Sequence, residues 1–314
     1  MSNRPVAAAV AAIVAAGTPC TLAAGNDGAK GLFYTSSAST GTDVTSVGSV
    51  ENEYIPQVLD QGTYSIDGSA QTVFGNSLTW GSWGNISLPI WADTYDTTVI
   101  DDGCNGFGNA NLTGKILLVR RGTCTFDTKA AAAVKGGTSY MMIYNNLPGT
   151  FDALVDDYNI DAAGMVNPET GATWIEALAA GKEVVLTFNS EFPLLIDSPG
   201  PVNSPLGGYM DSFSTWGLSN DLTIKPVVST PGGSVLSTYL TSAGGYQVES
   251  GTSMATPFIA GVIALFKQLK AGETVSPRDI NAALAASATP LEWYDGISSY
   301  PYLGSVGQQG GESI

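Results

Sequence analysis

The chain has 314 residues, of which 44% are hydrophobic and only 13% are charged. Acidic residues outnumber basic ones, and the formal net charge of −16 at pH 7 makes nucleic acid an unsuitable partner. The length suits one large domain or two smaller ones with an ample core, and no apolar run is long enough to predict a membrane span.

The first segment of the chain is expected to form the beginning of a folded core. Residues 5–16 form an alanine-rich helix ended by Gly17. A secretory signal peptide is the alternative, but the run has little hydrophobicity beyond alanine and the residues after it predict core structure. Strands are expected at 18–24 and 44–50. Asn26 lies in the turn after the first strand, where sites in α/β sheets collect, although asparagine is also a common turn residue.

The middle of the chain, from about residue 54 to 191, is rich in Gly, Asp, Asn and Thr. Three basic residues, Arg120, Arg121 and Lys129, could form an anion site, but a solvated basic edge is the interpretation we favour. The same region contains two glycosylation sequons, at Asn85 and Asn111, although sequons also arise by chance. Strands are expected at 115–120, 140–144 and 183–188, and helices at 127–137 and 172–180.

The three cysteines are Cys20, Cys104 and Cys124. The last two bracket one compact segment, so we expect them to form a disulfide, while Cys20 in an apolar strand is expected to be a buried thiol. This pattern indicates an oxidising compartment, and three reduced buried thiols are the alternative. The chain contains no histidine and no Cys-x-x-Cys pair, so we expect no zinc site.

A serine near the end of the chain lies at the start of an apolar helix. Apolar residues from Ala255 to Leu269 follow helical spacing and continue round the opposite face, which predicts a buried helix. Ser253 would lie at its N-terminus, where free N–H groups and the helix dipole stabilise a developing anion. A serine that merely caps the helix is the alternative. A further helix is expected at 278–286.

Two strings resemble the catalytic core of subtilisin-like serine proteases. The string GTSMATP at 251–257 resembles the nucleophile motif, which implies that Ser253 is the nucleophile. The string AAGNDG at 23–28 resembles the segment that carries the oxyanion-binding amide, which implies that role for Asn26. The family fold implied is α/β, a partial subtilisin-like parallel-sheet core of three layers.

A third resemblance concerns the middle of the chain. The string GKILLVRRGTCTF at 114–126, with Lys129 and the Tyr-Asn-Asn at 144–146, resembles the protease-associated (PA) domain, a small mixed α/β module inserted in large subtilisin-like proteases. The resemblances together imply the core at 1–54, an insert containing the PA domain at 55–191, the core with the nucleophile helix at 192–290 and a tail at 291–314.

The sequence lacks residues that the resemblance to serine proteases would lead one to expect. A serine hydrolase usually needs a histidine base, and neither the aspartate motif nor the histidine motif of the family precedes Asn26. We therefore expect a fragment of a secreted serine endopeptidase that acts on protein or peptide substrates but is inactive alone. Calcium sites occur in the family, but no Asp-rich loop assigns one here, so no cofactor or metal is expected.

Two other function classes stay open at this point. One is a non-catalytic pseudoprotease or protein-binding fragment that uses the PA domain. The other is a hydrolase with a different base, as in sedolisin-like proteases, which use a glutamate beside a similar serine motif. Glu249 is too near Ser253 in the sequence to be assigned that role, and Lys267 lies about 20 Å along the same helix.

Overall fold

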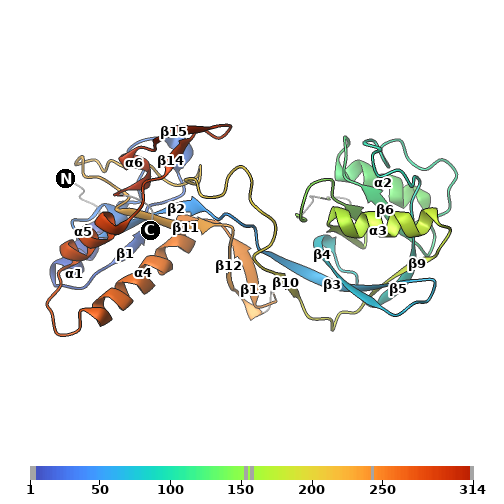
Figure 1. Cartoon of the computed structure of the whole chain (residues 1–314), viewed down its shortest axis with the longest axis horizontal. Helices are drawn as coiled ribbons and strands as arrows, with labels where there is room; N and C mark the ends of the chain where they lie inside the picture. Colours follow the sequence, from blue (N-terminus) through green and yellow to red (C-terminus); the bar gives the residue numbers. More distant parts are fainter. Residues whose placement is uncertain (1–4, 152–154, 156–158, 242–243, 312–314) are drawn as a thin grey trace. The chain divides into compact units, whose positions relative to one another are not determined.

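The computed structural model describes residues 5–151, 155, 159–241 and 244–311, so the ends of the predicted N-terminal segment and tail lie outside the described residues. The chain divides into two compact units, Met1–Pro56 with Val202–Ile314 and Gln57–Pro201 (Figure 1). The second unit extends past the expected end of the insert at residue 191. It does so because β10 (Leu195–Asp197) pairs antiparallel with β3 (Gln57–Ile66).

The first unit is built on a parallel sheet of three strands. The strands are β1 (Thr21–Ala23), β2 (Thr45–Glu51) and β11 (Val228–Gly233), in the order β1-β2-β11. Residues 45–50 of β2 are all buried, as expected for the central strand of a parallel sheet with both faces covered. The two strands predicted near the N-terminus are therefore present, the first of them shorter than expected.

Helix α4 (Thr252–Leu269) packs against all three strands of this sheet (Figure 1). Its buried residues are Thr252, Ala255, Ile259 and Ile263. The prediction of a helix buried all round is wrong, since Phe258, Leu265 and Leu269 are 51%, 68% and 82% exposed. The reason is geometric: a three-stranded sheet covers only one face of a helix.

Helix α4 is also, among the described residues, the one helix that is long and apolar enough to cross a membrane. The core helix of a soluble protein passes the same test of length and composition. Here the first turn is hydrogen-bonded to Asn26, and Ile259 and Ile263 pack into the core with Val47 and Val228 of the sheet. We therefore treat α4 as part of the core of this unit.

The remaining elements of the first unit surround the sheet. Helix α5 (Pro277–Ser287) begins at a capping box formed by Ser276 and Asp279, and Ile280 and Leu284 join the core of α4. The predicted helix at 278–286 is therefore confirmed. The other elements are α1 (Pro5–Ala15), the 3₁₀ helices η1 (Gly28–Lys30) and η2 (Ser37–Thr40), the hairpins β12 (Val235–Thr238)–β13 (Tyr246–Glu249) and β14 (Glu292–Tyr294)–β15 (Ser299–Leu303), and α6 (Val306–Gln309).

The second unit is an eight-stranded mixed sheet that closes on itself. The order is β10-β3-β4-β8-β7-β6-β5-β9, and an additional pairing of β3 with β9 closes the ring. Pairing is parallel from β5 to β8 and antiparallel elsewhere. The strands not yet given are β4 (Thr72–Gly81), β5 (Ile86–Trp91), β6 (Ile116–Arg120), β7 (Tyr140–Tyr144), β8 (Ala162–Val166) and β9 (Val184–Phe188).

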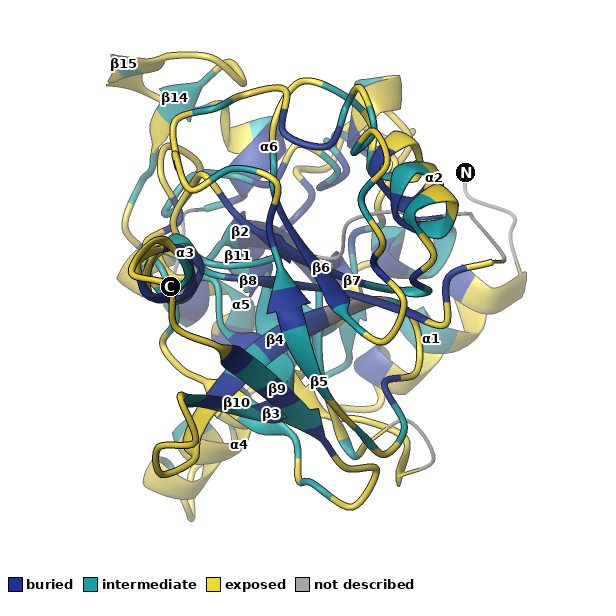
Figure 2. Ribbon diagram, turned by 90° about the vertical axis from the view of Figure 1, so that its right-hand side faces the viewer, coloured by how far each residue is buried: buried dark blue, intermediate teal, exposed yellow. Residues whose placement is uncertain are grey.

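Two helices cover different faces of this sheet. Helix α3 (Pro168–Ala179) buries Trp174 in an aromatic core, where its ring meets Phe74 edge-on at 5.0 Å. Helix α2 (Phe126–Gly136) buries Ala130 and Ala133 in a second core on the other side. The central strands are consequently buried on both faces, and β6 and β7 are largely dark blue in Figure 2. Helices and parallel strands in both units confirm the mixed α/β class.

Candidate active site

The loop after β1 is held in place by a distant segment of the same unit. The N–H of Asp27 donates to Thr215 Oγ1 at 2.8 Å, and the N–H of Gly28 donates to the carbonyl of Phe213 at 2.8 Å. Gly25 has φ = +114°, a conformation that favours glycine, and an added Cβ would lie 2.9 Å from Thr215 Oγ1. These contacts fix the direction in which Asn26 leaves the loop.

The side chain of Asn26 reaches the first turn of α4. Its Oδ1 accepts hydrogen bonds from the backbone N–H and the hydroxyl of Thr252, at 3.0 and 2.9 Å. The backbone N–H of Gly25 in turn donates to Thr252 Oγ1 at 3.2 Å. Two N–H or O–H donors on one side of the carboxamide require its oxygen there, so the amide nitrogen Nδ2 must point the other way.

That orientation brings two hydrogen-bond donors to one small space. A Cβ atom built on Gly251 would lie 3.2 Å from Asn26 Nδ2 and 3.7 Å from the backbone nitrogen of Ser253. Within the described part of the chain, neither of these donors has a recorded hydrogen-bond acceptor. A carboxamide and a backbone N–H that flank one space suit the stabilisation of an oxyanion.

Ser253 lies at this helix terminus with its side chain exposed. The chain contains no histidine that could accept its proton. Glu249 ends β13, and no hydrogen bond between Glu249 and Ser253 is recorded among the described residues. Lys267 lies in the last turn of α4, so it is remote from Ser253 at the first. The site therefore brings together Asn26 and Ser253 without either of the other bases considered from the sequence.

A pair of carboxyl groups that sequence reasoning missed lies near this site. Asp211, 4% exposed, accepts a short hydrogen bond from Ser49 Oγ and is hydrogen-bonded to Glu51. Burial and the neighbouring Glu51 raise the pKa of Asp211 to about 8. Ser234 connects the pair to the nucleophile turn, because its hydroxyl donates to Glu51 and its N–H to Ser250 Oγ.

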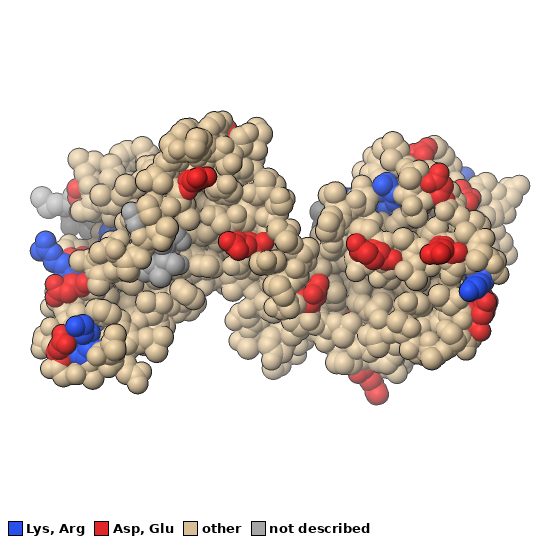
Figure 3. Space-filling model, in the orientation of Figure 1, with Lys and Arg blue, Asp and Glu red and all other residues tan. Residues whose placement is uncertain are grey.

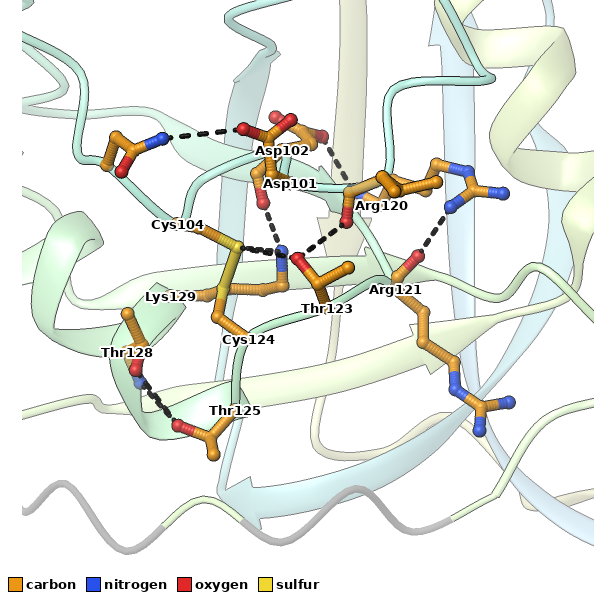
Figure 4. Close-up of a disulfide and its surroundings, with 12 residues drawn as sticks. Asp101, Asp102, Cys104, Arg120, Arg121, Thr123, Cys124, Thr125, Thr128 and Lys129 are labelled. Carbon is orange, nitrogen blue, oxygen red and sulfur yellow. Dashed lines mark hydrogen bonds between the residues drawn. A yellow bond between two sulfur atoms is a disulfide. The ribbon is translucent and has the colours of Figure 1, made fainter.

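In the second unit Cys104 and Cys124 form a disulfide (Figure 4). Their Cα atoms lie 5.7 Å apart, within the range for a disulfide. Thr125, the next residue, caps α2 by accepting a hydrogen bond from the N–H of Thr128, so the bridge is tied to the start of a helix. Cys20 is free and only half-buried, which corrects the expected buried thiol.

Lys129 beside the disulfide does not belong to a solvated basic edge, so that prediction is wrong. Its side chain is fully buried, and Nζ donates to the carbonyl of Asp102. The Asp102 carboxylate also accepts the N–H of Arg120 at 2.7 Å (Figure 4). Burial lowers the pKa of Lys129 and raises that of Asp102. Arg121 instead donates to Asn145 Oδ1 and lies over the ring of Phe151.

Asn85 and Asn111, the two sequon residues, are both exposed. The Oδ1 atom of Asn85 accepts from Ser190, and that of Asn111 accepts from the N–H of Thr113. Across residues 5–151, 155, 159–241 and 244–311, no group of three or more His, Cys, Asp or Glu side chains is arranged to hold a metal ion. On the face seen in Figure 3, acidic side chains are spread widely and basic ones are few.

The fold and this site define a class of protein, which comparison with known families identifies. The model of the Peptidase S8 or subtilase family matches residues 2–308. The chain therefore belongs to the subtilase family, as the two motifs around Asn26 and Ser253 predicted.

Curated relatives of the chain are subtilisin-like proteases. The minor extracellular protease Vpr of Bacillus subtilis (strain 168) is 36% identical over 201 residues, which cover 62% of this chain and 23% of Vpr. The PI-type proteinase of Lactococcus lactis subsp. cremoris is 28% identical over 279 residues, 82% of this chain and 14% of that protein. The C5a peptidase of Streptococcus pyogenes is 29% identical over 174 residues, which cover 55% of this chain and 14% of that peptidase. The chain thus spans less than a quarter of each of these relatives.

Proposed function

We propose that this chain carries the nucleophile and the oxyanion-binding part of a serine endopeptidase. Ser253 is the nucleophile that attacks the peptide carbonyl and forms the acyl-enzyme. The Nδ2 of Asn26 and the backbone N–H of Ser253 donate hydrogen bonds to the oxyanion that forms. The substrate is a protein or peptide, as the names of the related proteases indicate for those proteins.

One observation carries this proposal. The carboxamide of Asn26 is anchored by Thr252, so that its Nδ2 and the N–H of Ser253 face the same space. The residues come from segments 226 positions apart in the chain, and a helix cap alone would not need a distant carboxamide. Donors that are fixed before reaction are what stabilises a developing charge, because no reorganisation is then needed.

The chain alone is expected to turn over peptides very slowly. It contains no histidine, and in subtilisin the loss of the histidine alone costs about 2 × 10⁶ in turnover. Oxyanion stabilisation and substrate binding leave about 10³–10⁴ over the reaction in water, a value also taken from serine proteases. The nucleophile should therefore be detected by its reactivity and not by turnover.

We further propose that the second unit is a PA domain and that the protein is secreted. The disulfide, the exposed asparagines of both sequons and the word extracellular in the name of the Vpr protease support this assignment. The unit has no role in peptide-bond cleavage in this proposal. It serves as a binding module, and its strands and two flanking helices enclose hydrophobic clusters of their own.

The test is the site of reaction with a serine-directed phosphonate, mapped by peptide mass spectrometry. The expected adduct is on Ser253, absent in Ser253→Ala and formed about 10²–10³ more slowly in Asn26→Asp, which keeps the acceptor for Thr252 but loses the donor. An adduct on other serines, or an equal rate in Asn26→Asp, would contradict the proposal. Peptide hydrolysis assayed in parallel should be the same for the wild type and Ser253→Ala.

A further inference from the structure

The first unit contains a cavity of about 380 Å³ that has no part in the proposed function. This volume lies within the range of small-ligand sites. Its lining includes Gly28, residues 209–213, Trp216 and residues 293–296 at the end of β14. Figure 1 shows β14 and β15 side by side near α6. The described residues that line it do not include Ser253 or Asn26, so it is distinct from the space between those two residues.

Aromatic rings form the walls of this cavity. The rings of Trp216 and Trp293 have centroids 5.8 Å apart and planes at 80°, so the two indoles form a corner. The rings of Tyr209 and Tyr294 stack at 4.9 Å beside them. All four side chains line the cavity and are only partly buried. Aromatic faces attract cations that lie within about 6 Å of the ring centroid.

A fixed carboxylate lies at the exposed rim of the cavity. Asp295 Oδ1 accepts the N–H groups of Ile297 and Ser298 at 2.8 Å, and Oδ2 accepts the hydroxyl of Tyr300 at 2.7 Å. These hydrogen bonds hold the pKa of Asp295 below its usual value, and the hydrogen bond from Ser298 has the largest effect. The group is therefore ionised at neutral pH and held in one orientation.

Two further carboxyl groups line the cavity. They belong to Glu51 and to Asp211, and the side chain of Asp211 is buried. Among the described residues that line the cavity there is no lysine or arginine to pair with a carboxylate. A neutral apolar ligand would cover the carboxylates and leave them unpaired, which costs free energy.

We propose that this cavity binds a lysine side chain of a polypeptide, with the methylene stem against Trp216 and Trp293 and the ammonium group facing the carboxylates. A lysine satisfies both features of the cavity, because its stem covers apolar surface while its head pairs with negative charge. The site goes beyond the proposed peptidase function and requires neither Ser253 nor Asn26.

The experiment compares two probes that differ only in the terminal ammonium group of the side chain. Nα-acetyl-L-lysine methylamide and Nα-acetyl-L-norleucine methylamide are titrated into the full chain at about 0.15 M salt, where distant surface charges are screened. Binding is measured by isothermal titration calorimetry and by tryptophan fluorescence. The lysine probe should bind at least about tenfold more tightly, and Ser253→Ala should bind it equally well.

Variants locate the site. Asp295→Asn keeps an oxygen for the N–H groups of the turn but removes the charge, and it should weaken lysine binding about tenfold. Glu292→Gln is the matched control, because Glu292 is exposed on the same hairpin but does not line the cavity. Trp293→Leu keeps an apolar wall without a ring face, so it should weaken binding of the lysine probe but not of the norleucine probe.

Four results would each overturn the proposal. The first is equal affinity for the two probes, and the second is no binding of the lysine probe at millimolar concentration. The third is an equal loss of affinity in Glu292→Gln and Asp295→Asn, which would show attraction by the net charge of −16 instead of a site. A loss of lysine binding in Ser253→Ala would place the probe in the active site.

Discussion

The carboxamide of Asn26 illustrates how a single hydrogen-bond pattern determines chemistry. Thr252 supplies two donors to Oδ1, and this alone decides that Nδ2 faces the space beside Ser253. Gly251 leaves that space open, since any side chain there would lie between the two donors. The glycine is needed for room and not for backbone conformation, because its φ of 164° is extended.

Gly251→Ala is predicted to slow formation of the phosphonate adduct on Ser253 by about 10²–10³, because the added methyl group occupies the space meant for an oxyanion. Gly261→Ala is the matched control on the same helix. An added Cβ at Gly261 meets nothing within 4 Å, so this variant should react at the normal rate and be more stable by about 0.5–1 kcal/mol. Equal rates for the two variants would remove the assigned oxyanion space.

The raised pKa of Asp211 predicts that the stability of the protein depends on pH. Its pKa is raised from 3.8 to about 8 by burial and by Glu51, so the folded state binds a proton that the unfolded state releases. The contribution of Asp211 to stability is therefore full below pH 3.8 and falls as the pH rises to about 8. The slope is at most about 1.4 kcal/mol per pH unit.

Asp211→Asn is predicted to remove this slope. The asparagine resembles the protonated acid, because its Nδ2 can donate to Glu51 while its oxygen accepts from Ser49. Chemical denaturation of both proteins from pH 4 to 8 measures the difference. The two stabilities should be similar near pH 4, and the variant should be the more stable protein near pH 8. Parallel curves would show that Asp211 is ionised in the native protein.

Helix α4 shows why a periodic pattern does not fix burial. Apolar residues all round the helix predicted complete burial, yet only the face toward the sheet is covered. The sequence of a helix indicates which face is most apolar, but the number of strands beneath it is a property of the whole sheet. The two faces of α4 should therefore respond very differently to mutation.

Ile259→Ala is predicted to destabilise the first unit by about 2–5 kcal/mol, because Ile259 is fully buried against the sheet. Leu265→Ala, on the exposed face of the same helix, should change stability by no more than about 0.5 kcal/mol. Hydrogen exchange of the α4 amides reports on both. A large loss of protection in Leu265→Ala would mean that the exposed face is covered in solution.

The disulfide gives a prediction for the second unit. Cys104 and Cys124 close a loop with a sequence separation of 20, so replacing both with alanine should destabilise the unit by about 3 kcal/mol. Cys20→Ala is the control, since Cys20 is free and lies in the first unit. Thermal unfolding under non-reducing conditions makes the comparison. A double variant as stable as the control would show that the bridge does not stabilise the unit.

Several helices and strands could be predicted from the sequence, because the residue patterns that indicate them are local. Hydrophobic runs gave the strand at Tyr140–Tyr144, and a serine followed by a proline gave the start of α5. Asn26 and Ser253 were predicted as site residues through motifs that resemble those of a family. The cavity could not be found in this way, because its lining residues come from five separate stretches with no pattern in common. Burial of Lys129 was missed for the same reason, since Asp102 lies far from it in the sequence.

In the proposed function the chain supplies a nucleophile and an oxyanion space but no histidine base. It contains no histidine, and its net charge is −16. Without a general base, attack by Ser253 depends on the small fraction of alkoxide, and this fraction grows with pH. An enzyme with a base behaves differently, because its rate reaches a plateau once the base has lost its proton.

The most direct test of the account is therefore the pH dependence of adduct formation on Ser253. The rate is measured by intact-protein mass spectrometry with a hydrolysis-stable phosphonate, from about pH 6 to about pH 10, and Asp211→Asn is measured alongside to remove the titration of the acidic pair. We predict that the rate rises about tenfold per pH unit without a plateau, and that Ser253→Ala gives no adduct. A plateau with an apparent pKa near 7 in both proteins would contradict this prediction, because the chain would then contain a functional base.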